Sequence, residues 1–140
     1  MIKLKQFHTS DIVKFKPKLP FENMKADLEI AVSEYRYELS TLWRNDDIIG
    51  IAGLFNIRPG VAELFMLPSI LVDKYPLEFF KATKDMVEFC MRDYHRLQLT
   101  VDAEWKLGKK WARMLGFTEE GLMKAYSANK QDEYMFARVS

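Results

Sequence analysis

The sequence has few of the residues that build disulfides, metal sites and membrane segments. Cys90 is its single cysteine, so no disulfide forms within the chain, which fits a reducing compartment. His8 and His95 stand apart from any cluster of ligands, so we expect no metal site. The longest apolar run, residues 48–55, is too short to span a bilayer, and residues 1–10 lack the apolar stretch of a signal peptide. These absences predict a soluble, cytoplasmic protein.

The sequence also has no excess of positive or negative charge. The 21 basic and 20 acidic side chains leave a formal net charge of +1, so no overall field attracts a nucleic acid or a membrane. The basic run KLGKK between Trp105 and Trp111 carries too few charges to change that expectation. Glycine and proline are scarce, whereas 49% of the residues are apolar and 14% aromatic, a composition typical of compact globular proteins. The length predicts one domain over residues 1–140.

Hydrophobic periodicity predicts a hairpin-rich first half. The expected elements are a strand, two helices and three strands, over residues 2–6, 9–15, 23–33, 37–43, 48–55 and 61–67. Thr9, Ser10 and Asp11 are each able to cap the first helix. Pro59 and Gly60 occupy the central positions of a type II turn. The strand before that turn has no polar face, so we expect it to be covered on both sides.

In the second half of the sequence, hydrophobic periodicity predicts helices that alternate with strands. The expected elements are a long helix, a strand, a second helix and a hairpin, over residues 77–94, 97–101, 105–115, 120–127 and 134–139. The second of these helices is expected to bury Leu107, Trp111, Met114 and Leu115, and Gly116 is placed to end it in the left-handed conformation.

The order β-α-α-β-β-β-α-β-α-β-β predicts an α+β fold with a mixed sheet. Its one β-α-β crossover joins residues 61–67 to residues 97–101. By the handedness rule this crossover should be right-handed, with its two strands parallel.

This order, the hairpin into VAELFML, the long helix after it and the helix that ends in LGF resemble the GNAT superfamily of acyl-CoA-dependent N-acetyltransferases. Within that superfamily, the glycine-poor loop and the helix, strand, helix, glycine order are similar to small acetyltransferase-like proteins of T7-like podophages. The resemblance implies an enzyme that moves an acetyl group from acetyl-CoA to a primary amine of a small molecule or a protein.

The resemblance also implies where acetyl-CoA binds. The backbone of Phe65, Met66 and Leu67 would pair with the pantetheine arm. The following loop and the start of the long helix would take the pyrophosphate, with Lys74 and Lys81 as cationic partners.

Two residues are implied as catalytic. Glu63 would accept the amine proton, directly or through an ordered water; alternatively, it points out of a free face of the sheet. Tyr126, placed in the penultimate strand, would protonate the leaving thiolate; alternatively, it packs across the strands.

The sequence departs from the family pattern at two places. The loop region LPSILVDKYPLEFFK contains no glycine, and Ala112 stands where the family carries a tyrosine. These departures support a second hypothesis, in which the fold is kept without catalysis and the protein is a binding or assembly module, for example of a phage. The sequence predicts neither the acceptor nor whether the protein is a monomer or a homodimer.

Overall fold

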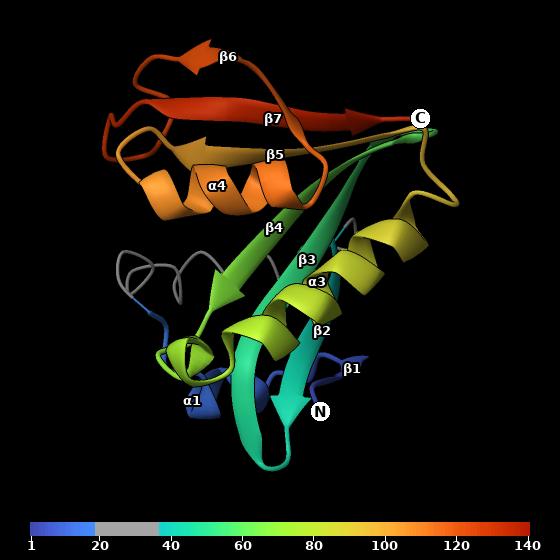
Figure 1. The fold of residues 1–140 in the computed structure, drawn as a ribbon, viewed down its shortest axis with the longest axis vertical. Coiled ribbons are helices and arrows are strands. Elements are labelled where there is room, and N and C mark those ends of the chain that lie inside the picture. Colours follow the sequence, from blue (N-terminus) through green and yellow to red (C-terminus); the bar gives the residue numbers. More distant parts are fainter. Residues whose placement is uncertain (19–36) are drawn as a thin grey trace. The chain divides into compact units, whose positions relative to one another are not determined.

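The computed structural model describes residues 1–18 and 37–140, so the helix expected over residues 23–33 lies outside the described residues. Figure 1 shows the elements as a ribbon. The strands are β1 (Lys3–Gln6), β2 (Tyr37–Arg44), β3 (Asp47–Arg58), β4 (Val61–Pro68), β5 (Arg96–Asp102), β6 (Thr118–Met123) and β7 (Glu133–Val139). The helices are α1 (Asp11–Lys14), the 3-10 turn η1 (Val72–Lys74), α3 (Pro76–Cys90) and α4 (Lys106–Met114).

The seven strands form a mixed sheet in the order β1-β2-β3-β4-β5-β7-β6. The pairs β1/β2, β2/β3, β5/β7 and β6/β7 are antiparallel, whereas β4 and β5 are parallel. The predicted α+β fold and the parallel β-α-β crossover are thereby confirmed. The β4/β5 ladder joins three residue pairs and ends at Glu63 and Gln98.

The chain divides into two compact units. One consists of Met1–Asn56 with Leu64–Met86, and the other of Ile57–Glu63 with Val87–Ser140. The expectation of one domain over residues 1–140 stays a prediction.

The core of the first unit forms around β3. Every residue of this strand from Ile48 to Leu54 is buried, as its lack of a polar face predicted. On one face, Ile51 and Leu67 pack with Phe15. On the other, the ring of Phe79 from α3 approaches the backbone of Gly50.

The short helix α1 is anchored by a buried carboxylate. Asp11 is 5% exposed, and its Oδ2 accepts hydrogen bonds from the hydroxyl of Thr41 (2.8 Å) and the N–H of His8 (3.0 Å). Ser10 occupies the N-cap position without a side-chain capping bond. Of the three capping candidates, Asp11 is therefore the residue whose side chain is bonded.

In the second unit, α4 ends as predicted. Gly116 has φ +91°, its N–H bonds to the carbonyl of Arg113 (3.0 Å), and the N–H of Phe117 bonds to the carbonyl of Ala112 (3.0 Å). This pair of bonds is the Schellman arrangement, which satisfies carbonyls that the last turn leaves without partners.

The predicted inner face of α4 was wrong at two positions. Leu107 and Met114 are 46% and 51% exposed, whereas Gly108 and Ala112 are buried. The ring of Trp105 lies against Gly108, where a side chain would collide with it. The helix therefore buries its small residues and leaves longer apolar side chains outside.

The long helix α3 ends four residues earlier than its apolar pattern predicted. Phe79, Thr83 and Val87 are buried, as expected. The helix stops at Cys90, and the N–H groups of Asp93 and Tyr94 both bond to the carbonyl of Cys90 in a closing turn.

Candidate active site

Glu63 occupies the last pair of the β4/β5 ladder, opposite Gln98. The Nε2 of Gln98 donates a hydrogen bond to Oε1 of Glu63 at 3.0 Å. Both side chains are half-buried. Glu63 is thus hydrogen-bonded to the neighbouring strand, and its catalytic role stays a prediction.

Arg96 fixes the orientation of the Gln98 amide. Its Nε donates to Oε1 of Gln98 at 3.1 Å, so the amide nitrogen is the end that faces Glu63. A reversed amide would set the guanidinium against an NH₂ group and the carboxylate against an oxygen, which neither hydrogen bond allows.

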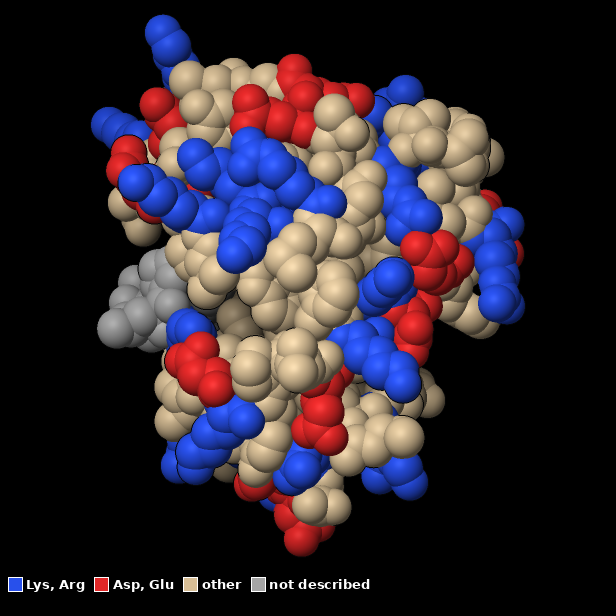
Figure 2. All heavy atoms as spheres, in the orientation of Figure 1, with Lys and Arg blue, Asp and Glu red and all other residues tan. Residues whose placement is uncertain are grey.

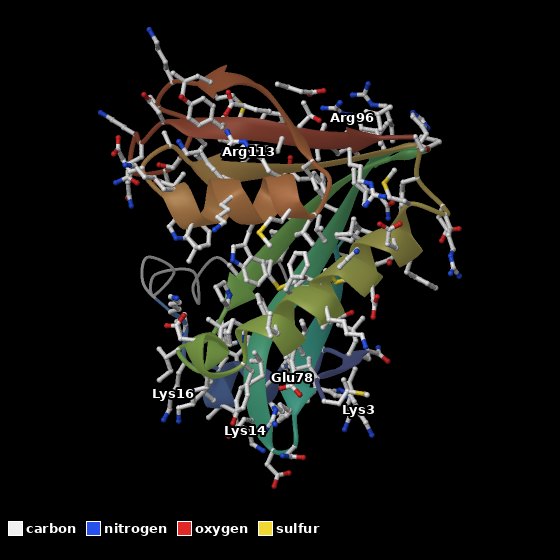
Figure 3. The ribbon with its side chains drawn as sticks, in the orientation of Figure 1. Lys3, Lys14, Lys16, Glu78, Arg96 and Arg113 are labelled. Carbon is white, nitrogen blue, oxygen red and sulfur yellow. The ribbon has the colours of Figure 1, made fainter. Side chains whose placement is uncertain are left out.

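Glu120 holds Arg96 in turn. The Nη1 and Nη2 atoms of Arg96 donate to the two carboxylate oxygens of Glu120 at 2.9 and 2.6 Å, a bidentate pair. The hydrogen bond from Arg96 lowers the pKa of the Glu120 carboxyl, so this carboxylate stays ionised at neutral pH. Arg96 lies at the start of β5, where Figure 3 labels it. A continuous chain of bonds therefore runs from Glu120 through Arg96 and Gln98 to Glu63.

The period of a strand explains why these side chains meet. Arg96 and Gln98 are two residues apart on β5, so they share one face of the sheet, and Glu63 is opposite Gln98. Leu97 alternates to the other face, together with its partner Arg138, which donates to the carbonyl of Leu115 at the end of α4. The bonded chain thus occupies the face away from α4.

Sequence reasoning missed Gln98 and Arg96. The available signal was the alternation in RLQL, where polar residues at positions 96 and 98 flank the buried Leu97. That pattern indicates a polar strand face, but the bond to Glu63 depends on the register between β4 and β5.

Tyr126 lies outside the strand in which it was predicted. The strand β6 ends at Met123, so Tyr126 belongs to the loop before β7, and it is 52% exposed. The predicted strand over residues 120–127 was too long, because Ala125 adopts a left-handed φ of 52°, which breaks the extended backbone.

Tyr126 nevertheless lies within electrostatic reach of Glu63. Partial burial raises the pKa of the Tyr126 hydroxyl, and the negative charges of Glu63 and Glu133 raise it further. The phenol is therefore protonated at neutral pH and is available as a proton donor. The structure brings the two predicted catalytic residues into one unit.

The predicted acetyl-CoA residues lie in the first unit. Leu67 is 2% exposed, and Phe65 packs against the same apolar cluster, so these two side chains belong to the core. The sulfur of Met66 lies near Gly50. Phe65 and Met66 are half-buried, and the implied pairing of this backbone with a pantetheine arm stays a prediction. Lys74 in η1 and Lys81 in α3 are exposed.

Backbone N–H groups between β4 and α3 are engaged inside the protein. Five of them donate as follows: Ile70 to the carbonyl of Lys16 (2.8 Å), Leu71 to Oγ of Ser69 (3.0 Å), Val72 to the carbonyl of Ser69 (3.2 Å), Lys74 to that of Leu71 (3.1 Å) and Tyr75 to that of Val72 (3.1 Å). A pyrophosphate held by backbone amides needs such donors to point outward. These five N–H groups are therefore committed to acceptors of the protein, and the implied pyrophosphate site over the loop and the start of α3 stays a prediction.

Figure 2 shows lysine and arginine side chains gathered over α4. Two cationic side chains of α4 contact other residues of the second unit. Arg113 is bound to Glu119 at 3.2 Å, and the ammonium of Lys109 lies 4.8 Å from the ring centre of Tyr134. Lys106 and Lys110 are exposed. Arg113 is thus paired with a carboxylate, whereas Lys109 keeps its charge beside the ring of Tyr134.

Residues 1–18 and 37–140 contain no group of three or more His, Cys, Asp or Glu side chains arranged to hold a metal ion. In the same part of the chain, no helix is long and apolar enough to cross a membrane.

Solved structures resemble this chain over nearly its whole length, although no family model and no curated protein matches its sequence. A GNAT-family acetyltransferase from Streptococcus pneumoniae is 17% identical with a TM-score of 0.69, and the match covers 99% of each chain. A substituted form of the spermidine N-acetyltransferase of Vibrio cholerae is 14% identical with a TM-score of 0.73, covering 99% of this chain and 93% of that one. The ribosomal-protein-S5-alanine acetyltransferase of Vibrio fischeri is 15% identical with a TM-score of 0.70, covering 99% and 92%.

These matches place the chain among α+β proteins with the architecture of acetyltransferases. In particular, the fold is the GNAT fold, as the order of elements and the LGF helix end predicted.

Proposed function

We propose that this protein is an N-acyltransferase that moves an acetyl group from a thioester, with acetyl-CoA as the first donor to test, to a primary amine. The observation that carries the proposal is Glu63, held by Gln98 at the end of the β4/β5 ladder. The GNAT fold supports the reaction class. The lone cysteine fits a cytoplasmic setting.

The chemistry needs a base and an acid, and Glu63 and Tyr126 suit these roles. The amine attacks in its neutral form. Its nitrogen bonds to the thioester carbon and passes a proton to Glu63, directly or through a water, while the carbon–sulfur bond breaks and the departing thiolate takes the proton of the Tyr126 hydroxyl. Each such proton transfer contributes roughly 10²–10⁴ in rate.

The acceptor belongs to the class of amines. Among the similar structures, one is named for spermidine and another for the alanine of a ribosomal protein, so both small and protein-borne amines occur with this fold. We infer the same two kinds of acceptor for this chain.

The test is an acyl-transfer assay on the purified chain. Acetyl-CoA is supplied with spermidine, other polyamines and peptides that begin with alanine, and thiol release is followed while mass spectrometry detects the acetylated product. We expect at least one acceptor to give both signals. If thiol release does not exceed the enzyme-free rate with any acceptor, the proposal fails. The alternative is then a non-catalytic binding or assembly module with the same fold.

Gln98 is a positioning residue for Glu63, and Gln98→Leu tests this role. The variant removes the donor that faces the Glu63 carboxylate, so we expect kcat to fall by about tenfold with an unchanged KM for the donor.

Gln131→Leu is the matched control, because Gln131 is exposed in the loop between β6 and β7. It should leave both kcat and KM unchanged. An unchanged kcat in Gln98→Leu would show that the bond to Glu63 does not orient the base.

A further inference from the structure

Asp132 bonds to the ends of two strands of the second unit. It precedes Glu133, the first residue of β7, and β7 lies between β5 and β6 in the sheet (Figure 1). Its backbone carbonyl accepts the N–H of Ala103, the residue after the end of β5, at 2.9 Å. Its side-chain Oδ1 accepts the N–H of Ala125, two residues past the end of β6, at 2.8 Å. Asp132 therefore ties the start of β7 to the ends of both neighbouring strands.

The bond from Asp132 holds the backbone of Ala125 in a strained conformation. Ala125 has a φ of 52°, in the left-handed region, where a Cβ crowds the backbone. A residue other than glycine keeps such a conformation when the surrounding structure holds it, and residues of this kind cluster at functional sites. Tyr126 is the next residue, so the same bond fixes the point from which its side chain leaves the backbone.

The hydroxyl of Tyr126 lies within electrostatic reach of two carboxylates on one face of the sheet. Alternate residues of a strand share a face, so Glu133 lies on the same face as Ala137, which is paired with Gln98. Gln98 in turn donates a hydrogen bond to Glu63. Burial raises the pKa of the Tyr126 hydroxyl, and the charges of Glu63 and Glu133 raise it further. The loop thus presents Tyr126 to the face of the sheet that carries the proposed base.

We propose that Asp132 is a positioning residue for Tyr126: by holding the N–H of Ala125, it places the hydroxyl that protonates the leaving thiolate. This inference rests on the proposed acyl transfer and deepens it by a residue that acts through the backbone of the loop. A displacement of about 1 Å at a reacting group costs up to about 10²-fold in rate, so a bond outside the reacting groups controls kcat.

The experiment compares two substitutions of Asp132. Asp132→Ala removes the acceptor for the N–H of Ala125, whereas Asp132→Asn removes the charge and keeps an oxygen that accepts this bond. The pKa of Tyr126 is measured by NMR on isotope-labelled tyrosine, and the signal is assigned by its loss in Tyr126→Phe. In Asp132→Ala this pKa should fall towards the ordinary value of tyrosine, because the ring moves away from the two carboxylates and into solvent. In Asp132→Asn it should stay raised.

Thiol release tests the consequence for catalysis. Asp132→Ala should lower kcat about tenfold with an unchanged KM for the donor, and Asp132→Asn should stay within about twofold of the wild-type rate. In the Tyr126→Phe background, Asp132→Ala should cause no further loss, because both residues act through the same hydroxyl. Asp93→Ala is the control. It removes an exposed acid after α3 in the same unit and should change neither the pKa of Tyr126 nor kcat.

The outcomes separate this inference from the proposed function. An unchanged Tyr126 pKa in Asp132→Ala would overturn the positioning role and leave the acyl transfer in place. An equal fall of this pKa in Asp132→Ala and Asp132→Asn would overturn it too, because the charge and not the bond would then be responsible. A loss of kcat of about tenfold that persists in the Tyr126→Phe background would have the same meaning. If the wild-type chain releases no thiol, the acyl transfer is overturned, and the two titrations alone decide whether Asp132 places the ring.

Discussion

Glu63→Gln should lower kcat for acetyl transfer by about 10²–10⁴-fold while the donor binds as before. The amide has nearly the shape of the carboxylate, but it cannot take a proton from the attacking amine. The hydrogen bond from Gln98 fixes the orientation of this group, so the loss reports on the base and not on a collapsed site. Single-turnover rates and donor affinity, measured on the same preparations, separate the chemical step from binding.

Glu119→Gln is the matched control. Glu119 lies on β6 opposite Phe136, its carboxylate pairs with Arg113 on the α4 side of the sheet, and its loss should leave kcat unchanged. A Glu63→Gln enzyme within about twofold of the wild-type rate would remove Glu63 from the mechanism.

The same assay examines Tyr126. Its hydroxyl is a protonated donor at neutral pH, because burial and two nearby carboxylates raise its pKa. Tyr126→Phe should therefore lower kcat and abolish the alkaline limb of its pH profile. An alkaline limb that persists in the variant would assign the thiolate proton to another group.

Phe136→Ala should lower the free energy of unfolding by about 3–5 kcal/mol. Phe136 is fully buried on β7, between Leu99 of β5 and Glu119 of β6, and the guanidinium of Arg113 lies 5.6 Å from its ring centre. Truncation removes a ring from under α4 and leaves a cavity that the sheet cannot close. Urea denaturation followed by tryptophan fluorescence measures the change.

Leu122→Ala provides the comparison for Phe136→Ala. Leu122 belongs to β6 and is 45% exposed, so its truncation should cost about 1 kcal/mol or less. If the two variants were equally stable, the ring of Phe136 would not be the packing centre of this unit.

The sequence predicted the backbone conformation correctly wherever residues adjacent in the chain decide it. Gly60 and Gly116 were placed correctly because only a residue without Cβ takes a positive φ there at no steric cost. The buried strand β3 followed from its continuous apolar composition.

Local signals failed where side-chain packing decides. The pattern of α4 favoured Leu107 and Met114 as inner residues, but the buried positions are Ala112 and Gly108, and Gly108 lies against the ring of Trp105. Ala112, which stands where the resemblance implies a tyrosine, is 3% exposed and belongs to the core.

The sequence by itself determined the order of the elements, the ends of α4 and of the β3 hairpin, and therefore the GNAT fold. These depend on composition, periodicity and glycine, which are properties of short segments. Only the tertiary structure decided that Gln98 and Arg96 support Glu63. This result depends on the register between β4 and β5, which joins residues far apart in the chain and which no local pattern encodes.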